Sequence, residues 1–176
     1  MSTSNLTIQS PCKINLGLKI INKRDDGYHN ISSIFIALDL FDTLTFIPSN
    51  RFDVKFLNAD IPLKNTVSKA AGLISKLYNI DVGYKILIDK KIPIGSGLGG
   101  GSSNAAQTLK MLNKIYSLKL KNSFLEELGK KIGSDVPFFI RGGIKKISGT
   151  GNIIKNINSA AIQDKIFLLV FPEFSV

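Results

Sequence analysis

The chain has 176 residues, and 23 Lys and Arg residues against 13 Asp and Glu residues give it a formal net charge of +10. Hydrophobic residues make up 44% and charged residues 20%, which excludes a largely disordered chain and favours one packed domain, or one domain with part of a second. A single cysteine, Cys12, excludes an internal disulfide and a thiolate zinc site and indicates a reducing compartment. No leader-like start and no apolar run of roughly 18 residues are present, so we expect a soluble, cytoplasmic protein without a membrane span.

The positive charge suits nucleic acid, a phosphorylated metabolite or an anionic membrane surface. Only three of the 23 basic residues are arginines, namely Arg24, Arg51 and Arg141. Base readout usually relies on arginine, and no run of five or six like charges is present. We therefore predict that most of this charge is solvated surface, and nucleic-acid binding is kept only as an alternative.

The first half of the chain is predicted to be mostly sheet. Residues 5–22 alternate as a strand that Pro11 interrupts, and residues 23–30 form a polar turn. Residues 31–48, together with the short stretch 51–56, predict two or three further strands because they are rich in Ile, Phe, Leu and Thr.

The second half alternates helices with short strands. A helix of about three turns begins near Asn65 or Thr66, either of which can cap it, and residues 84–88 return to a strand. Residues 102–116 then predict an amphipathic helix. The next helix is expected to start with a capping box formed by Ser123 and Glu126 and to end at Gly133 in the C′ position. Short apolar runs follow near residues 144–154, and residues 166–171 are apolar enough to predict a buried strand.

A glycine-rich loop at residues 95–101, GSGLGGG, immediately precedes the amphipathic helix. Glycine lets backbone N–H groups turn toward an oxyanion, and a helix N-terminus adds unpaired donors and a positive dipole end. The loop matches neither the P-loop pattern, since no Lys precedes Ser102, nor the dinucleotide fingerprint, since no acidic partner follows. A flexible turn is the alternative, but the flanking Lys90 and Pro93 and the serines at the helix start favour a phosphate site.

Lys13, Asn15 and Asp135 are the candidate chemical groups outside this loop. Lys13 and Asn15 alternate on a strand and share one face, while Asp135 lies between a helix end and an apolar run. If Lys13 and Asp135 converge near a bound phosphate, they form a phosphoryl-transfer site. The alternatives are a solvated lysine at a sheet edge and a carboxylate that caps a turn.

Tyr28 and His29 lie on the polar turn of the first half. Their adjacency suits stacking and hydrogen bonding to a flat polar ligand. Ordinary surface residues on a loop are the alternative interpretation.

Four segments in this order, PCKINLGLKI, RDDGYHNISSIF, PIGSGLGGGSSNAA and GSDVPFFIRGG, resemble the GHMP small-molecule kinases. The resemblance implies an α+β fold, namely the ribosomal-protein-like N-terminal domain of that family. It implies an ATP-binding domain over residues 1–160 and, over residues 161–176, the first strand of a C-terminal domain whose remainder is absent. Lys145 and Lys146 depart from the family, where small or apolar residues are usual.

The resemblance also implies roles for single residues. Lys13 would hold the acceptor hydroxyl and the developing charge, and Asp135 would accept the hydroxyl proton. Asn15, Tyr28 and His29 would bind the cytidine-bearing substrate. ATP would enter with Mg²⁺ as co-substrate, without dedicated metal ligands. The residues that would bind the nucleotide are Asn65, Lys90, Pro93, Ile94, Gly95, Ser96, Gly97, Leu98, Gly99, Gly100, Gly101, Ser102 and Ser103.

The activity that the resemblance implies is ATP-dependent phosphorylation of the 2-hydroxyl of 4-diphosphocytidyl-2-C-methyl-D-erythritol, a step of non-mevalonate isoprenoid synthesis. The alternatives are another small-molecule kinase of the family, of the homoserine or mevalonate type, and a non-catalytic ATP-binding fragment. Because one wall of the family's cleft would be absent, we expect weak or no catalysis from these residues alone. No nucleic-acid or membrane partner is expected, and the sequence carries no signal for an oligomeric state.

Overall fold

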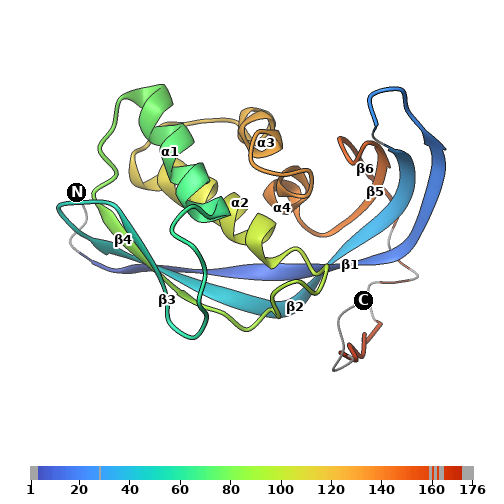
Figure 1. Cartoon of the computed structure of the whole chain (residues 1–176), viewed down its shortest axis with the longest axis horizontal. Helices are drawn as coiled ribbons and strands as arrows, with labels where there is room; N and C mark the ends of the chain where they lie inside the picture. The colour runs from blue at the N-terminus through green and yellow to red at the C-terminus, as the bar shows by residue number, and fades with distance from the viewer. Residues whose placement is uncertain (1–3, 28, 159, 161, 163–164, 172–176) are drawn as a thin grey trace.

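A computed structural model describes residues 4–27, 29–158, 160, 162 and 165–171. The helices lie together on one side of a curved sheet, and the sheet curls up beyond them at one end (Figure 1). The elements, in chain order, are β1 (Leu6–Lys23), β2 (His29–Pro48), β3 (Asp53–Phe56), α1 (Thr66–Tyr78), β4 (Tyr84–Asp89), α2 (Gly100–Ile115), α3 (Asn122–Lys130), α4 (Val136–Arg141), β5 (Ile144–Gly149) and β6 (Ile153–Asn156). The α+β fold that the sequence predicts is confirmed. No helix in the described part of the chain is long and apolar enough to cross a membrane.

The two longest strands, β1 and β2, form an antiparallel hairpin along the whole sheet. The pairing shifts register between Pro11 and Cys12, as expected for a residue that cannot donate a ladder hydrogen bond. Residues 31–48 form one continuous strand, and residues 53–56 form the second of the two or three strands that were predicted here.

The other edge of β2 is shared by two strands. β4 pairs with its second half from Thr43 to Pro48, and β5 pairs with its first half from Ile31 to Ile36. Strand β3 adds to β4 in parallel, and β6 adds to β5 in antiparallel. Residues 37–42 of β2 therefore face a split in the sheet, and the loops from β4 to α2 and from α4 to β5 reach β2 there.

The core fills the space between the sheet and the helices. Helix α1 begins at the predicted place, because the Asn65 side chain accepts hydrogen bonds from the backbone N–H groups of Val67 and Ser68 and completes a capping box. Its buried face packs on α2, and the largest buried side chains come from both the helices and the inner face of β2 and β4. Those side chains include Phe46, Tyr84, Ile86, Leu109, Leu112 and Phe138.

Three predicted helix boundaries are wrong, one in α2 and two in α3. Helix α2 begins at Gly100, inside the glycine-rich segment, rather than at residue 102. Helix α3 has Lys121 as its N-cap and no side-chain cap, so the predicted capping box of Ser123 and Glu126 is not formed, and the helix ends before Gly133. The reason is tertiary, because the Glu126 carboxylate turns inward and pairs with Arg141 of α4 at 2.8 Å.

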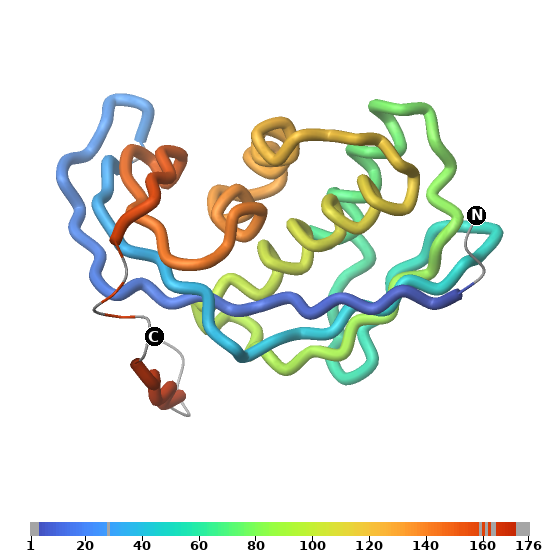
Figure 2. The backbone as a smooth tube through the Cα atoms, turned by 180° about the vertical axis from the view of Figure 1, so that it is seen from behind, coloured from blue at the N-terminus to red at the C-terminus, as the bar shows by residue number. Residues whose placement is uncertain are grey.

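The buried strand predicted over residues 166–171 is also wrong for the described part of the chain. Residues 165–171 pair with no strand, and Ile166 and Leu168 are 98% and 88% exposed. The segment lies on the side of the sheet opposite the helices, as Figure 2 shows from behind. Only Leu169 packs on a small apolar cluster there, because no described strand offers the segment a partner.

Candidate active site

The segment that leads from β4 into the first residues of α2, residues 93–101, has glycine at most of its positions and is called the glycine-rich loop below. Gly95, Gly97 and Gly99 have φ values of 74°, 73° and 73°, in the left-handed region that other residues enter only at a cost. Gly99 is the N-cap of α2 and offers no side chain to the first N–H groups of the helix. These groups have no partner within the helix, so the loop and the helix start present backbone donors and a positive dipole end.

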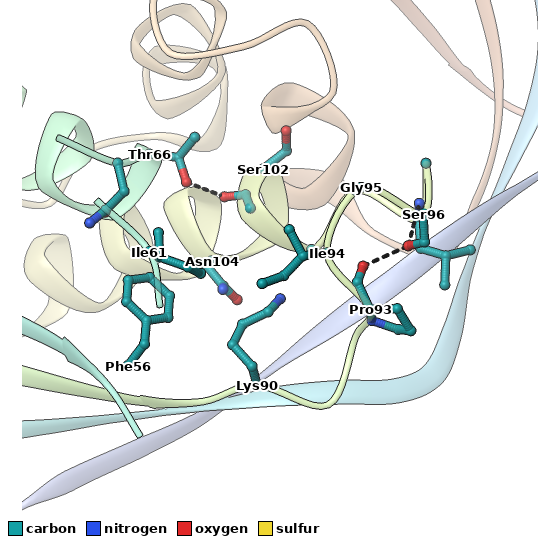
Figure 3. A pocket seen from close by; sticks show the side chains of 16 residues that line it. Phe56, Ile61, Thr66, Lys90, Pro93, Ile94, Gly95, Ser96, Ser102 and Asn104 are labelled. Atoms are coloured by element: carbon teal, nitrogen blue, oxygen red, sulfur yellow. Dashed lines mark hydrogen bonds between the residues drawn. The ribbon is translucent and has the colours of Figure 1, made fainter. Parts of the chain in front are cut away.

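A cavity of about 290 Å³ opens over this loop (Figure 3). One part of its wall is apolar, with Phe56 and Ile61 facing the exposed side chain of Ile94. The hydroxyl of Thr66 donates to the Gly101 carbonyl at 2.7 Å and ties the start of α1 to the loop. A site with an apolar end and a donor-rich end suits a ligand that carries a ring and phosphate groups.

The structure brings Lys13, Asn15 and Asp135 together beside the same loop. The Lys13 ammonium lies 3.6 Å from an Asp135 carboxylate oxygen and donates to Asn15 Oδ1 at 2.6 Å. It also lies 4.5 Å from the centre of the Phe35 ring, in cation–π geometry. The Lys13 side chain is 8% exposed and the Asp135 side chain 29%, so the pair opens to solvent on the aspartate side.

The backbone holds this pair against the loop. The Lys13 N–H donates to the Leu98 carbonyl at 2.9 Å, which joins β1 to the glycine-rich loop. A Cβ at Gly99 would meet Lys13 Cγ at 3.3 Å and the Phe139 ring at 2.9 Å. Glycine at this position therefore lets the loop pack directly on the lysine and on α4.

Helix α4 positions Asp135 at its start. The Asp135 side chain makes no capping hydrogen bond, so its carboxylate is not used by the helix, unlike the capping role that was the alternative prediction. Lys110 of α2 donates to the Phe139 carbonyl at 3.2 Å and fixes α4 to α2. Burial lowers the pKa of Lys110, since the surrounding helices remove the ammonium from water.

Lys90, expected near the nucleotide, lies in the cavity wall, but its ammonium is already paired. It donates to Asp42 Oδ2 at 2.6 Å, and the two side chains are 7% and 0% exposed. The sequence reasoning missed Asp42. The sequence does carry a signal for it. Asp42 occupies an alternate position of β2 that shares its face with Leu44 and Phe46, both of which are buried in the core, so a carboxylate is unexpected there.

The remaining predicted nucleotide residues divide between the cavity and its surroundings. Asn65 lines the cavity, but its amide is occupied in capping α1. Ser103 does not line it, because its buried hydroxyl accepts a hydrogen bond from Ser10 at 2.8 Å. The other predicted residues line the cavity: Pro93, Ile94, Gly95, Ser96, Gly97, Leu98, Gly99, Gly100, Gly101 and Ser102.

Of the two predicted substrate residues other than Asn15, the structure describes His29, which follows the turn between β1 and β2. His29 is the first residue of β2, is exposed and pairs in register with Lys23. Tyr28 lies outside the described residues. Figure 1 places this turn at the curled end of the sheet, away from α1. His29 pairs with Lys23, ten residues along β1 from Lys13, so the register does not bring His29 to the Lys13 pair.

Comparison with known proteins identifies the class to which this architecture belongs. The family described as "GHMP kinases N terminal domain" matches residues 65–143, which include α1, the glycine-rich loop and Asp135. A crystal structure of 4-(cytidine 5'-diphospho)-2C-methyl-D-erythritol kinase superimposes with a TM-score of 0.77 at 35% identity, covering 86% of this chain and 55% of that chain. The mevalonate kinase of Methanococcus jannaschii shares the fold, with a TM-score of 0.68 at 24% identity over 88% of this chain and 56% of that chain. Residues 65–143 thus match the N-terminal domain of GHMP kinases, and the fold of the described chain resembles that of solved kinases with this domain.

Curated relatives narrow the similarity to one kind of kinase. The 4-diphosphocytidyl-2-C-methyl-D-erythritol kinase of Prochlorococcus marinus (strain MIT 9515) is 44% identical over 100% of this chain and 58% of the relative. A putative kinase of the same name from Streptococcus mutans serotype c (strain ATCC 700610 / UA159) is 44% identical over 96% of this chain and 60% of the relative. The chain thus spans a little over half the length of the curated relatives that it matches.

Proposed function

We propose that this chain forms the ATP-binding half of a kinase that phosphorylates the 2-hydroxyl of 4-diphosphocytidyl-2-C-methyl-D-erythritol. The observation that carries the proposal is the Lys13 and Asp135 pair, 3.6 Å apart, packed against a glycine-rich loop that leads into α2. The choice of substrate rests on the activity for which relatives at 44% identity are named. The ATP-binding unit would comprise residues 1–160, and residues 161–176 would begin a second domain.

The proposed reaction moves a phosphoryl group from ATP to a hydroxyl. The glycine-rich loop and the N-terminus of α2 bind the triphosphate through backbone N–H groups, and the apolar wall of the cavity receives the base. The carboxylate of Asp135 accepts the hydroxyl proton as the oxygen bonds to the γ-phosphorus. The ammonium of Lys13 stabilises the charge that develops on the acceptor oxygen, and ADP leaves.

Magnesium fits this site as a companion of ATP. Mg²⁺ usually keeps several waters and binds through one or two carboxylates together with substrate phosphates. Within residues 4–27, 29–158 and the described tail, no group of three or more His, Cys, Asp or Glu side chains could hold a metal ion. We therefore assign the ion to the phosphates of the nucleotide, where it would neutralise charge during transfer.

Asn15 and the turn at Tyr28 and His29 are proposed to bind the acceptor. Asn15 accepts a hydrogen bond from Lys13, so a hydroxyl bound at Asn15 would lie beside the reacting pair. The turn at His29 would then hold the cytidine end of a long substrate, at the curled end of the sheet. The buried, unpaired Cys12 is compatible with the reducing cytoplasm that we propose as the location.

The direct test uses phosphorus NMR to measure ATP-dependent formation of the 2-phosphate by this chain. Lys13→Met and Asp135→Asn are the test variants, and Asp53→Asn, an exposed carboxylate on β3, is the matched control. Product formed by the chain and by the control, but not by the test variants, supports the proposal. Faster phosphorylation of mevalonate or homoserine would contradict the proposed substrate.

A second candidate function is ATP binding without transfer, and it is favoured by the cavity over the glycine-rich loop, whose lining residues include neither Lys13 nor Asp135. Calorimetric titration separates the two candidates. ATP binding without any product at high protein concentration supports the second candidate. Absence of ATP binding contradicts both.

A further inference from the structure

Asp42 of β2 is a fully buried carboxylate that accepts four hydrogen bonds. Its Oδ1 accepts from the backbone N–H groups of Lys91 and Ile92, both at 2.9 Å. Its Oδ2 accepts from the Lys90 ammonium at 2.6 Å and from Asn104 Nδ2 at 3.0 Å. The Asp42 side chain is 0% exposed.

These four donors come from the two ends of the glycine-rich loop. Residues 90–92 lead from β4 into the loop, and Asn104 lies in the first turns of α2. Asp42 itself lies where β2 faces the split in the sheet, so its side chain replaces the strand partner that is missing there. One carboxylate thus fixes both ends of the loop to the same point on β2.

Burying a charge here is costly unless its partners repay the lost hydration. An apolar side chain would fill the space but would leave two backbone N–H groups and an ammonium without acceptors. The ion pair with Asp42 also neutralises the charge of Lys90. In the cavity wall the Lys90 side chain points toward that of Asn104 (Figure 3). The attraction of the cavity for an anion therefore depends on loop geometry more than on this lysine.

The orientation of the Asn104 amide agrees with this arrangement. Because a carboxylate can only accept, the amide is turned so that Nδ2 donates to Asp42. Its Oδ1 is then buried without a hydrogen-bond partner in the described part of the chain. The amide tolerates an unsatisfied oxygen because its nitrogen is held by the carboxylate.

We infer that Asp42 is a positioning residue of the proposed nucleotide site, which holds the two ends of the glycine-rich loop so that its N–H groups are aimed at the phosphates in advance. The inference rests on the proposed function. The inference predicts that loss of the Asp42 charge weakens ATP binding, which is opposite to the change that simple electrostatics predicts. Removing a negative charge beside a triphosphate site should tighten ATP binding, whereas releasing the ends of the loop should weaken it.

The first test compares ATP affinity in Asp42→Asn and in the control Asp53→Asn, well below the melting temperature of each. Asp53 is an exposed aspartate on β3 with a lysine 3.9 Å away, so the change in net charge is the same. We expect about 10- to 100-fold weaker binding in Asp42→Asn, as for lost hydrogen bonds to a charged group, and little change in the control. Unchanged or tighter binding by folded Asp42→Asn would overturn the inference.

A pair exchange tests the network itself. In Asp42→Asn combined with Asn104→Asp, the amide oxygen at 42 still accepts from Lys91 and Ile92, its nitrogen donates to the new carboxylate, and that carboxylate returns a negative charge to the neighbourhood of Lys90. We expect ATP affinity to recover to within about threefold of the wild type, since position 42 is again hydrogen-bonded to both ends of the loop and the charge of Lys90 is again balanced. A folded double variant that binds no better than the single variant would contradict positioning.

A measurement without ligand separates this inference from the proposed function. Hydrogen exchange of the amides at residues 94–101 should speed up in Asp42→Asn, while exchange in α3 stays unchanged. If the wild type binds no ATP, the proposed function fails, and loop exchange still decides the role of Asp42. If Asp42→Asn does not fold, Asn104→Ala removes one of the four hydrogen bonds without a change in charge. Faster loop exchange in that variant supports the inference, and unchanged exchange overturns it.

Discussion

The glycine-rich loop offers a comparison of two substitutions that differ only in their surroundings. Gly97 and Gly99 both have φ near 73°, so alanine pays the same cost at both positions for a left-handed backbone, about 1–2 kcal/mol. A Cβ at Gly97 meets nothing within 4 Å. A Cβ at Gly99 lies 2.9 Å from two atoms of the Phe139 ring, which is 1% exposed and cannot move away freely.

The extra crowding at Gly99 sets the size of the expected difference. Overpacking in a well-packed interior costs about 1–3 kcal/mol, so Gly99→Ala should lose about 2–5 kcal/mol and Gly97→Ala about 1–2 kcal/mol. For a chain of this length each kcal/mol lowers the melting temperature by roughly 2–4 °C. Gly99→Ala should also weaken ATP binding more, because it displaces the ring and Lys13 together.

Urea unfolding followed by circular dichroism measures both free energies, and titration with ATP measures the affinities. Gly95→Ala is a second control, since its φ is 74° and its Cβ would also meet open space. Equal losses in Gly97→Ala and Gly99→Ala would refute the reasoning, because the contact with Phe139 would then carry no cost. A larger loss in Gly97→Ala would refute it as well.

Three further predictions address the reacting pair, helix α3 and the buried lysine of α2. Lys13→Met and Asp135→Asn should each lower kcat by about 100-fold or more while changing the Kd for ATP by less than about threefold, because they act on the transition state. Stopped-time product assays and ATP titration measure the two quantities, and a parallel loss of affinity would contradict this assignment. Ser123→Ala should change the free energy of unfolding by less than about 0.5 kcal/mol, because the hydroxyl is exposed and caps nothing. Glu126→Gln should cost about 1–3 kcal/mol, because it weakens a two-pronged ion pair with the guanidinium of α4. A larger loss of unfolding free energy in Ser123→Ala than in Glu126→Gln, measured by urea unfolding, would contradict this assignment and favour the capping box. Burial lowers the pKa of Lys110 below its usual 10.5, so the unfolded chain binds more protons between the two pKa values. The stability of the wild type should therefore rise relative to Lys110→Met as the pH increases toward 10.5, and an opposite slope would refute the sign.

Local patterns predicted the elements whose causes are local. Asn65 caps α1, and the break at Pro11 appears as a register shift, because both effects act within a few residues of the chain. Helix α3 shows where this reasoning ends. Ser123 and Glu126 have the spacing of a capping box, but Glu126 gains more from the guanidinium of Arg141, 15 residues away, than from the helix start.

The candidate site was predictable in part for the same reason. The glycine-rich loop is a contiguous segment, so its composition, together with the flanking Lys90 and Pro93 and the serines at the helix start, predicts a phosphate site. Asp42 lies 48 residues before its partner Lys90, and nothing in the sequence between them indicates that they meet. The two residues meet because the split in the sheet leaves this part of β2 open to the start of the loop, and strand pairing of this kind is not encoded in any local pattern.

Two lysine–aspartate pairs flank the glycine-rich loop, and their geometry argues for different tasks. Lys90 and Asp42 are 2.6 Å apart and almost wholly buried, so neither can approach a substrate without giving up a strong contact. Lys13 and Asp135 are 3.6 Å apart, and the Asp135 side chain is 29% exposed. A substrate hydroxyl can therefore reach the carboxylate from the solvent side. In the sequence both pairs are only a lysine and a distant carboxylate. Burial and separation, which arise from the fold, assign loop positioning to the first pair and chemistry to the second.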